Sequence, residues 1–403
     1  MKSRTRKNNR VINDQGRFAT LLRIVFVGAL VVGIISPAHA GSAEQARRIH
    51  ERLAGVPPSD TVLTQMTIAI DSNDATGAAI IAMDNVNFYN VTLKNFAAPW
   101  TNRDQSVFVP LNDYIATVIG MIRDSDTIPF NRLLWDDITY VGRPGVVLDD
   151  PSNSSNRHYE QLEADQINLR DELLLTTQSS VQNIPPGVTA GIMTSRAASK
   201  AFFIAGTNRA MFRFTLLNHM CNDLEQMHDT RIPPDRIRQD VSRSPGGDSR
   251  LFLNSCIGCH SGMDPMAGAF AYYDYDENSG QLVYDNTAVH SKYFNNDLNF
   301  PQGFRTTNDS WENRWRVGQN AYLGFDGSLP GFGSGAKELG RELANSEAFA
   351  SCQVRKVFRT VCLRDAEDQP DRDAATLMTD TFRTTGYSMK QVFADSAVHC
   401  MGP

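Results

Sequence analysis

Two cysteines and a histidine, Cys256, Cys259 and His260, stand close together in the sequence Ser-Cys-Ile-Gly-Cys-His. The C-x-x-C-H spacing is the attachment signature of c-type haem. In a helix, residues three and four positions apart share a face, so the two thiols and the imidazole would face one object. Two thiols can add to the two vinyl groups of a haem, and the imidazole then lies under the iron as its proximal ligand. The motif therefore predicts one covalent haem c, bound through Cys256, Cys259 and His260.

A bare C-x-x-C pair also occurs in redox dithiols and in zinc sites. A zinc site would need a second ligand pair at comparable spacing. The sequence has no second C-x-x-C, since Cys352 and Cys362 are separated by nine residues. The histidine that follows the second cysteine is what haem attachment requires. A disulfide or redox pair is the main alternative for Cys256 and Cys259.

The residues before the motif predict the helix that would position it. Pro and Gly at 245–247 break the chain, and Asp248 is a good N-cap for a helix that continues through Cys256. The carbonyl of Pro265, or another backbone carbonyl nearby, is expected to accept the Nδ1 proton of His260 and so fix its tautomer.

Residues 1–40 have the pattern of a secretory signal peptide. Seven Lys and Arg precede or flank an apolar core at 24–35, and Ala38-His39-Ala40 supplies a small-x-small cleavage site. The apolar core is short for a membrane span of roughly 20 residues, so cleavage after Ala40 is expected and no span should remain. In a bacterium this predicts a periplasmic protein, and the periplasm is where haem is attached covalently.

The mature chain is acidic. Residues 1–40 hold seven of the 39 basic and one of the 45 acidic residues, so cleavage changes the net charge from −6 to −12. This charge makes nucleic acid or an anionic membrane surface an unsuitable partner. A basic redox partner protein fits it, and the oligomeric state is left open.

The pattern along the chain predicts a mainly α-helical fold in two domains. Residues 41–190 are expected to form a helical domain with a loop-rich end, and residues 191–403 a cytochrome c-like haem domain with long loops. Helices are predicted at 42–54, 60–70, 75–85, 111–123, 160–174, 198–217 with a break at 206–209, 336–345, 349–363, 371–384 and 388–398. A β-hairpin is predicted at 272–284. This hairpin also resembles part of a calcium loop, but its glycine is displaced by one residue.

The remaining four cysteines are Cys221, Cys352, Cys362 and Cys400. In an exported chain they suggest two disulfides, with three possible pairings. Cys352 and Cys362 flank one predicted helix and would lie about 15 Å apart, beyond disulfide reach. Cys221 should therefore pair with one of them and Cys400 with the other.

The motif and its surroundings resemble a family of proteins. The C-x-x-C-H segment is followed by Met263-Asp264-Pro265 and then by aromatic and acidic residues at 270–274. In this it is similar to the large cytochrome c-like proteins of planctomycetes and related bacteria. Gly206-Thr-Asn-Arg209, Phe325-Asp-Gly327 and the helix around Cys352 also resemble that family. The likeness covers about residues 190–400 and departs at 266–268, where the family's glycine would fall one residue earlier. It implies haem c, and an association with degradation of complex organic compounds, but no defined reaction.

The distal haem ligand is less clear than the proximal one. Met389, at the start of a predicted helix, is the first choice, because a methionine ligand would raise the potential as suits an electron carrier. The other candidates are His290, Met378, His399 and Met401 downstream of the motif, and His219, Met220, Met227 and His228 upstream of it.

Three functions are compatible with these features. The first is a periplasmic mono-haem c-type cytochrome that passes single electrons to a partner protein. The second is a haem-dependent oxidoreductase that acts on an organic substrate, with the large non-haem region as the substrate site. The third is a cytochrome-derived binding subunit in which the haem is structural. The sequence has no G-x-S-x-G elbow, P-loop, dinucleotide fingerprint or H-E-x-x-H, which favours redox chemistry over hydrolysis.

Overall fold

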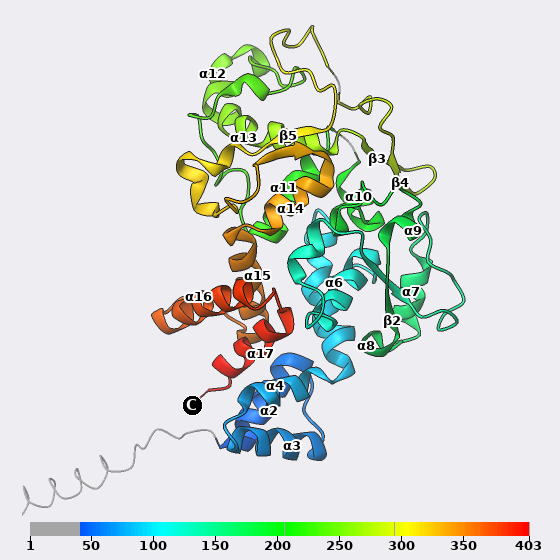
Figure 1. Ribbon diagram of the computed structural model, residues 1–403, viewed down its shortest axis with the longest axis vertical. Helices are drawn as coiled ribbons and strands as arrows, with labels where there is room; N and C mark the ends of the chain where they lie inside the picture. Colours follow the sequence, from blue (N-terminus) through cyan, green and yellow to red (C-terminus); the bar gives the residue numbers. More distant parts are fainter. Residues whose placement is uncertain (1–40, 205, 294, 403) are drawn as a thin grey trace, which may run out of the picture. The chain divides into compact units, whose positions relative to one another are not determined.

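The computed structural model describes residues 41–204, 206–293 and 295–402, and Ser42–Met401 form one compact unit. The predicted signal peptide at 1–40 lies outside the described residues. The fold is mainly helical, as the sequence predicts (Figure 1). The α-helices are α2 Ser42–Ala54, α3 Asp60–Asp71, α4 Ala75–Met83, α5 Lys94–Ala97, α6 Asp113–Arg123, α7 Arg157–Ala164, α8 Leu169–Glu172, α9 Gln178–Gln182, α10 Arg196–Phe202, α11 Arg209–Met220, α12 Ser249–Leu251, α13 Ile257–Ala267, α14 Gly335–Ala344, α15 Glu347–Cys362, α16 Gln369–Thr384 and α17 Met389–His399.

Helices α2, α3 and α4 pack against one another, and their starts follow from local signals. The Ser59 side chain accepts a hydrogen bond from the Val62 amide and caps α3, and Asp74 caps α4 in the same way through Gly77. Helix α2 buries Ala46, Ile49 and Leu53. These are the positions that the helical spacing of apolar residues predicts, and the bounds of α2 match the prediction.

The strands form three two-stranded antiparallel sheets in the described part of the chain. Their members are β1 Thr139–Gly142 with β2 Leu173–Thr176, β3 Tyr273–Asp276 with β4 Gln281–Tyr284, and β5 Ser310–Glu312 with β6 Phe332–Ser334. The β3–β4 pair is the predicted hairpin, with Tyr273 opposite Tyr284. Asp274 in this hairpin makes an ion pair with Lys292 and lies 2.9 Å from Nε2 of His290.

Residues 143–190 are more ordered than predicted. In place of one helix at 160–174, the chain forms α7 and α8 and then β2, which returns to pair with β1. His158 on α7 is buried: its Nε2 accepts the Gly142 amide and its Nδ1 lies 2.7 Å from the Asp149 carbonyl oxygen. These interactions tie the loop that follows β1 to α7.

The C-terminal helices pack on the N-terminal ones. Helix α17 contacts α4 and α2 as well as α15 and α16, and the Arg48 side chain donates to the carbonyl of Met401. Helix α15 contacts α11, which leads toward the motif. A domain boundary near residue 190 remains a prediction, and helices from both sides of it pack together.

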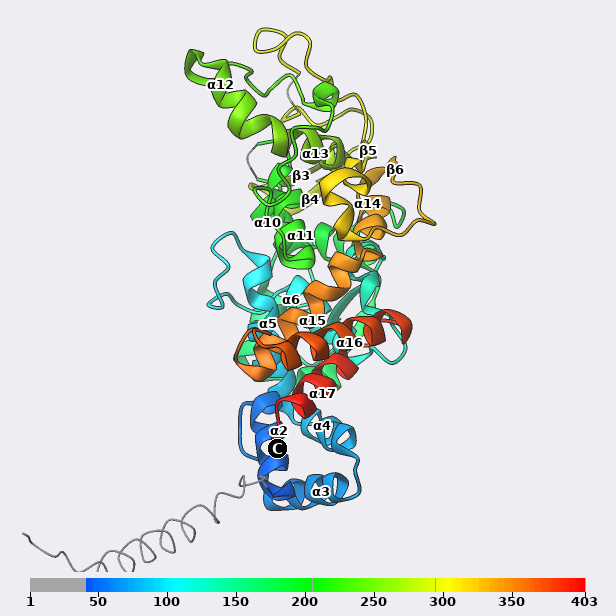
Figure 2. The same cartoon turned by 90° about the vertical axis from the view of Figure 1, so that its left-hand side faces the viewer.

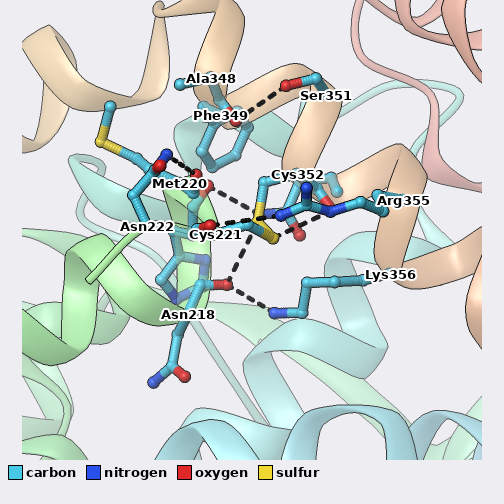
Figure 3. The surroundings of a disulfide bond; sticks show 12 residues. Asn218, Met220, Cys221, Asn222, Ala348, Phe349, Ser351, Cys352, Arg355 and Lys356 are labelled. Atoms are coloured by element: carbon cyan, nitrogen blue, oxygen red, sulfur yellow. Dashed lines mark hydrogen bonds between the residues drawn. A yellow bond between two sulfur atoms is a disulfide. The ribbon is translucent and has the colours of Figure 1, made fainter. Parts of the chain in front are cut away.

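Two disulfides join Cys221 to Cys352 and Cys362 to Cys400, which agrees with the exclusion of a Cys352–Cys362 pair. The first links the end of α11 to α15 (Figure 3). Beside it, Arg355 donates to the Cys221 carbonyl and Lys356 donates to the Asn218 carbonyl at 2.5 Å. Gln353 also donates to the His219 carbonyl, so the end of α11 is fixed to α15 by a covalent bond and several hydrogen bonds.

Candidate haem-attachment site

The motif lies on a continuous helical segment from Ser249 to Ala267 (Figure 2). The side chain of Asp248 accepts the Arg250 amide and caps α12, as predicted. A π-helical segment, η7 Phe252–Cys256, then leads directly into α13. Such π segments inside helices are frequent at functional sites.

Cys256, Cys259 and His260 fall within little more than one turn of this segment. Cys256 is the residue before α13, and Cys259 and His260 are in its first turn. At 3.6 residues per turn, Cys259 and His260 lie three and four positions from Cys256 and share its face. All three side chains are half-buried. Two thiols and an imidazole are therefore presented together at an accessible helix face.

Both motif cysteines are free, whereas the other four are paired. The Cys259 thiol lies 3.3 Å from the carbonyl oxygen of Leu224. Burial, with smaller contributions from Glu225 and Cys256, raises the pKa of the Cys259 thiol. At neutral pH this site therefore holds a protonated thiol.

The imidazole of His260 is oriented by a carboxylate, not by a backbone carbonyl. Its Nδ1 lies 3.1 Å from Oδ1 of Asp264, one helical turn further on, so the predicted contact with the Pro265 carbonyl is replaced by this side-chain contact. An ionised carboxylate only accepts hydrogen bonds, so Nδ1 is the donor. In the neutral imidazole, Nε2 then carries the lone pair that a metal ligand needs.

Asp264 is held by charged partners from outside α13. The Nε of Arg209 donates to its Oδ1 at 2.8 Å, the Nη2 of Arg209 to its Oδ2 at 3.1 Å, and the Arg238 amide to Oδ2 at 3.2 Å. Arg209 also makes a bidentate pair with Asp240. Burial alone would raise the pKa of Asp264, but the charges of Arg209 and Arg238 and the contact with His260 outweigh it and hold this pKa well below its usual range. Asp264 is therefore an ionised acceptor at neutral pH.

The opposite face of α13 is packed against two rings. A Cβ at Gly258 would lie 2.6 Å from the His228 ring, and a Cβ at Gly262 would lie 2.0 Å from Nε1 of Trp315. Gly258 and His260 are two residues, or about 200°, apart around the helix. The two glycines thus allow close packing behind the motif and leave the cysteine face open.

Met389 is not brought to this site. It is buried at the start of α17, which packs against α15, α4, α16 and α2, whereas α13 contacts α11 and the segments next to it. In both views α11, α14 and α15 lie between α13 and α17 (Figures 1 and 2).

The other distal candidates have partners elsewhere or lie behind α13. His219 is buried with its Nε2 at 2.7 Å from the Tyr114 hydroxyl, and His399 pairs with Asp371. His228 packs behind α13, and its Nε2 has no hydrogen-bond partner in the described part of the chain. Met378 receives a contact from Ser396 inside the C-terminal helices. His219, His399 and Met378 thus make their contacts with residues outside the motif.

Arg209 and Asp240 belong to this site although the sequence did not predict them there. A local signal existed for Asp264, because position i+4 from His260 lies on the same helix face. No local signal links His260 to Arg209 or Asp240, which precede it by many residues and reach it only through the fold. The Gly-Thr-Asn-Arg segment ending at Arg209 and the segment containing Asp264 meet at this ion pair.

No protein-family model, no curated protein and no solved structure matches this chain. Within 41–402, apart from residues 205 and 294, no helix is long and apolar enough to cross a membrane. The same residues contain no cluster of three or more His, Cys, Asp or Glu side chains arranged to hold a metal ion by themselves.

Proposed function

We propose that this chain is a mono-haem c-type cytochrome of the periplasm that passes single electrons to a partner protein. The observation that carries the proposal is the face of α13. It presents two free thiols at C-x-x-C spacing beside an imidazole whose Nδ1 is already occupied. The other four cysteines are in disulfides, so the motif pair is set apart from the structural ones.

The donor set fits haem c. Each thiol of Cys256 and Cys259 would add its S–H across one vinyl group, forming a carbon–sulfur bond while the hydrogen goes to the other vinyl carbon. No oxidant is needed for this addition. His260 would offer Nε2 to the iron, and the bound haem would supply one-electron chemistry. Leu251 and Leu253, which precede the motif on the same segment, are half-exposed and offer an apolar surface next to the thiols.

The periplasmic assignment rests on the predicted signal at 1–40 and gains support from the two disulfides, because disulfides persist in oxidising compartments. The net charge of −12 after cleavage suits docking to a basic redox partner.

A haem-dependent oxidoreductase is the second candidate, and one observation favours it. The first-choice distal ligand, Met389, is buried in α17 away from α13. An iron without a protein distal ligand would have an open position for a substrate or a gas. Rapid binding of carbon monoxide to the ferrous protein would favour this candidate, and a six-coordinate iron in both oxidation states would favour the carrier.

Variants of the motif test the proposal. The full chain is expressed with cytochrome c maturation machinery, purified in denaturant and assayed for haem that stays bound. C256A/C259A should lose covalent haem, whereas C362A/C400A, which also removes two cysteines, should keep it. H260A should keep the thioether bonds but change the spectrum of the iron. Covalent haem on C256A/C259A would contradict the attachment residues, and an unchanged H260A spectrum would contradict the ligand.

A further inference from the structure

Asp264 stands out among the buried charges because one of its oxygens touches the proposed iron ligand. Its side chain is 0% exposed, and its Oδ1 contacts both Nδ1 of His260 and Nε of Arg209. A residue that only anchored α13 to α11 would need the arginine contact alone. The contact with Nδ1 gives the carboxylate a second role on the far side of the imidazole.

The surrounding charges keep Asp264 an acceptor. Arg209 bridges Asp264 and Asp240 with two donors to each. The Arg238 side chain makes no hydrogen bond to Asp264: its Nη2 donates to Thr207 at 2.5 Å, its Nε lies 3.7 Å from Oδ1 of Asp240, and its Cζ lies 4.9 Å from the centre of the Tyr293 ring. Asp264 and Asp240 thus lie among the guanidiniums of Arg209, Arg238 and Arg243, and Asp264 is the carboxylate that contacts the imidazole.

We propose that Asp264 is a positioning residue that holds the His260 ring and, by its negative charge, favours the ferric over the ferrous state of a haem bound there. This inference rests on the proposed function. A carboxylate that accepts the outer N–H of a ligating histidine fixes the ring and raises its basicity. Ferric iron carries one more positive charge than ferrous iron and gains more from a stronger donor. The reduction adds one electron, which the titrating reductant supplies, and requires no proton transfer.

The chain offers matched variants. D264N keeps the size of the side chain and an oxygen that can accept from Nδ1, but removes the charge. D240N removes the other carboxylate of the same arginine and leaves the contact with His260 in place. D264N/R209M is the companion to D264N, because replacing both members of a buried ion pair is tolerated better than removing one, and Asp240 keeps its contact with Arg238.

The test is a spectroelectrochemical titration of the purified holoprotein, together with its covalent haem content. D264N should shift the ferric–ferrous equilibrium at least tenfold toward the ferrous state, which is about 59 mV upward for a one-electron couple. D264N/R209M should shift it in the same direction, and D240N should change it less than threefold. All variants should carry the same covalent haem as the parent.

Three results would overturn the inference. The first is a ferric–ferrous equilibrium constant of D264N within threefold of that of the parent, and the second is a shift of this constant in D240N as large as in D264N. The third applies if D264N does not fold, and it is an unchanged constant in D264N/R209M. In each of these cases a parent that carries covalent haem leaves the proposed function intact. A parent without covalent haem would instead refute the proposed function itself.

Discussion

Arg209 and Arg213 offer a direct measurement of what holds the motif helix in place. They lie one turn apart on α11, and each makes a bidentate pair with an aspartate. They differ in burial. Arg209 is 22% exposed between Asp264 at 0% and Asp240 at 18%, whereas Arg213 is 48% exposed with Asp223 at 27%. Replacing each arginine by methionine keeps most of the side-chain volume and removes the charge.

The structure sets the two expected magnitudes. R209M leaves the buried Asp264 carboxylate with two hydrogen-bond partners, His260 and the Arg238 amide, and with the nearby charge of Arg238. Breaking a buried pair by removing one partner costs 3–5 kcal/mol, and these two remaining partners put the expected loss at about 3 kcal/mol. That is roughly a hundredfold in the folding equilibrium. R213M removes an exposed pair, for which about 0–1 kcal/mol is typical.

The assay is urea unfolding of the mature protein followed by circular dichroism, with the free energy of unfolding taken from the midpoint and the slope. R209M should lose about 3 kcal/mol, and R213M less than about 1 kcal/mol. A loss below about 1 kcal/mol for R209M, or equal losses for the two variants, would refute the idea that burial makes this ion pair the anchor of α13.

Three further predictions concern other parts of the fold. G262A should destabilise the protein by about 1–3 kcal/mol, because its Cβ would lie 2.0 Å from Nε1 of the buried Trp315. The control G327A should not destabilise it, because its Cβ meets nothing within 4 Å. Equal unfolding midpoints for the two variants would contradict this prediction. Burial, and secondarily Arg355, lowers the pKa of Lys356 well below its usual value. The unfolded chain therefore binds one more proton than the folded chain, and the free energy of unfolding should rise with pH up to about 10.4. K356M should flatten this rise, and an unchanged slope of the free energy of unfolding against pH would contradict the prediction. In the exported chain made without haem, an alkylating reagent should label only the two motif cysteines before reduction and all six after it, and any other count by mass spectrometry would contradict the pairing.

Local signals account for the parts of the fold that could be predicted. Helix α2 follows from the spacing of Ala46, Ile49 and Leu53, and α3 from the cap at Ser59. The exclusion of a Cys352–Cys362 disulfide followed from the length of α15, which holds these cysteines too far apart to pair, and the fold decides between the two pairings that remain. Each of these inferences needs only neighbouring residues and the geometry of a helix.

The features that were missed depend on long-range contacts. Strand β2 is short and forms because β1 lies beside it, which the apolar run at 173–175 does not reveal. The haem-attachment motif could be predicted, because it is a local pattern of spacing. The Arg209–Asp264 pair that fixes its helix could not, because these residues meet only in the fold. The location of Met389 inside the C-terminal helices likewise depends on how α17 packs.

The measurement that tests the central claim most directly is the haem content of the mature protein. The chain is expressed with the maturation machinery, denatured and extracted with acidified acetone, and the pyridine haemochrome spectrum of the remaining protein is recorded. One haem per chain, lost in C256A/C259A, is the predicted result. A parent protein with no haem left after extraction would contradict the claim and return Cys256 and Cys259 to thiol or metal chemistry.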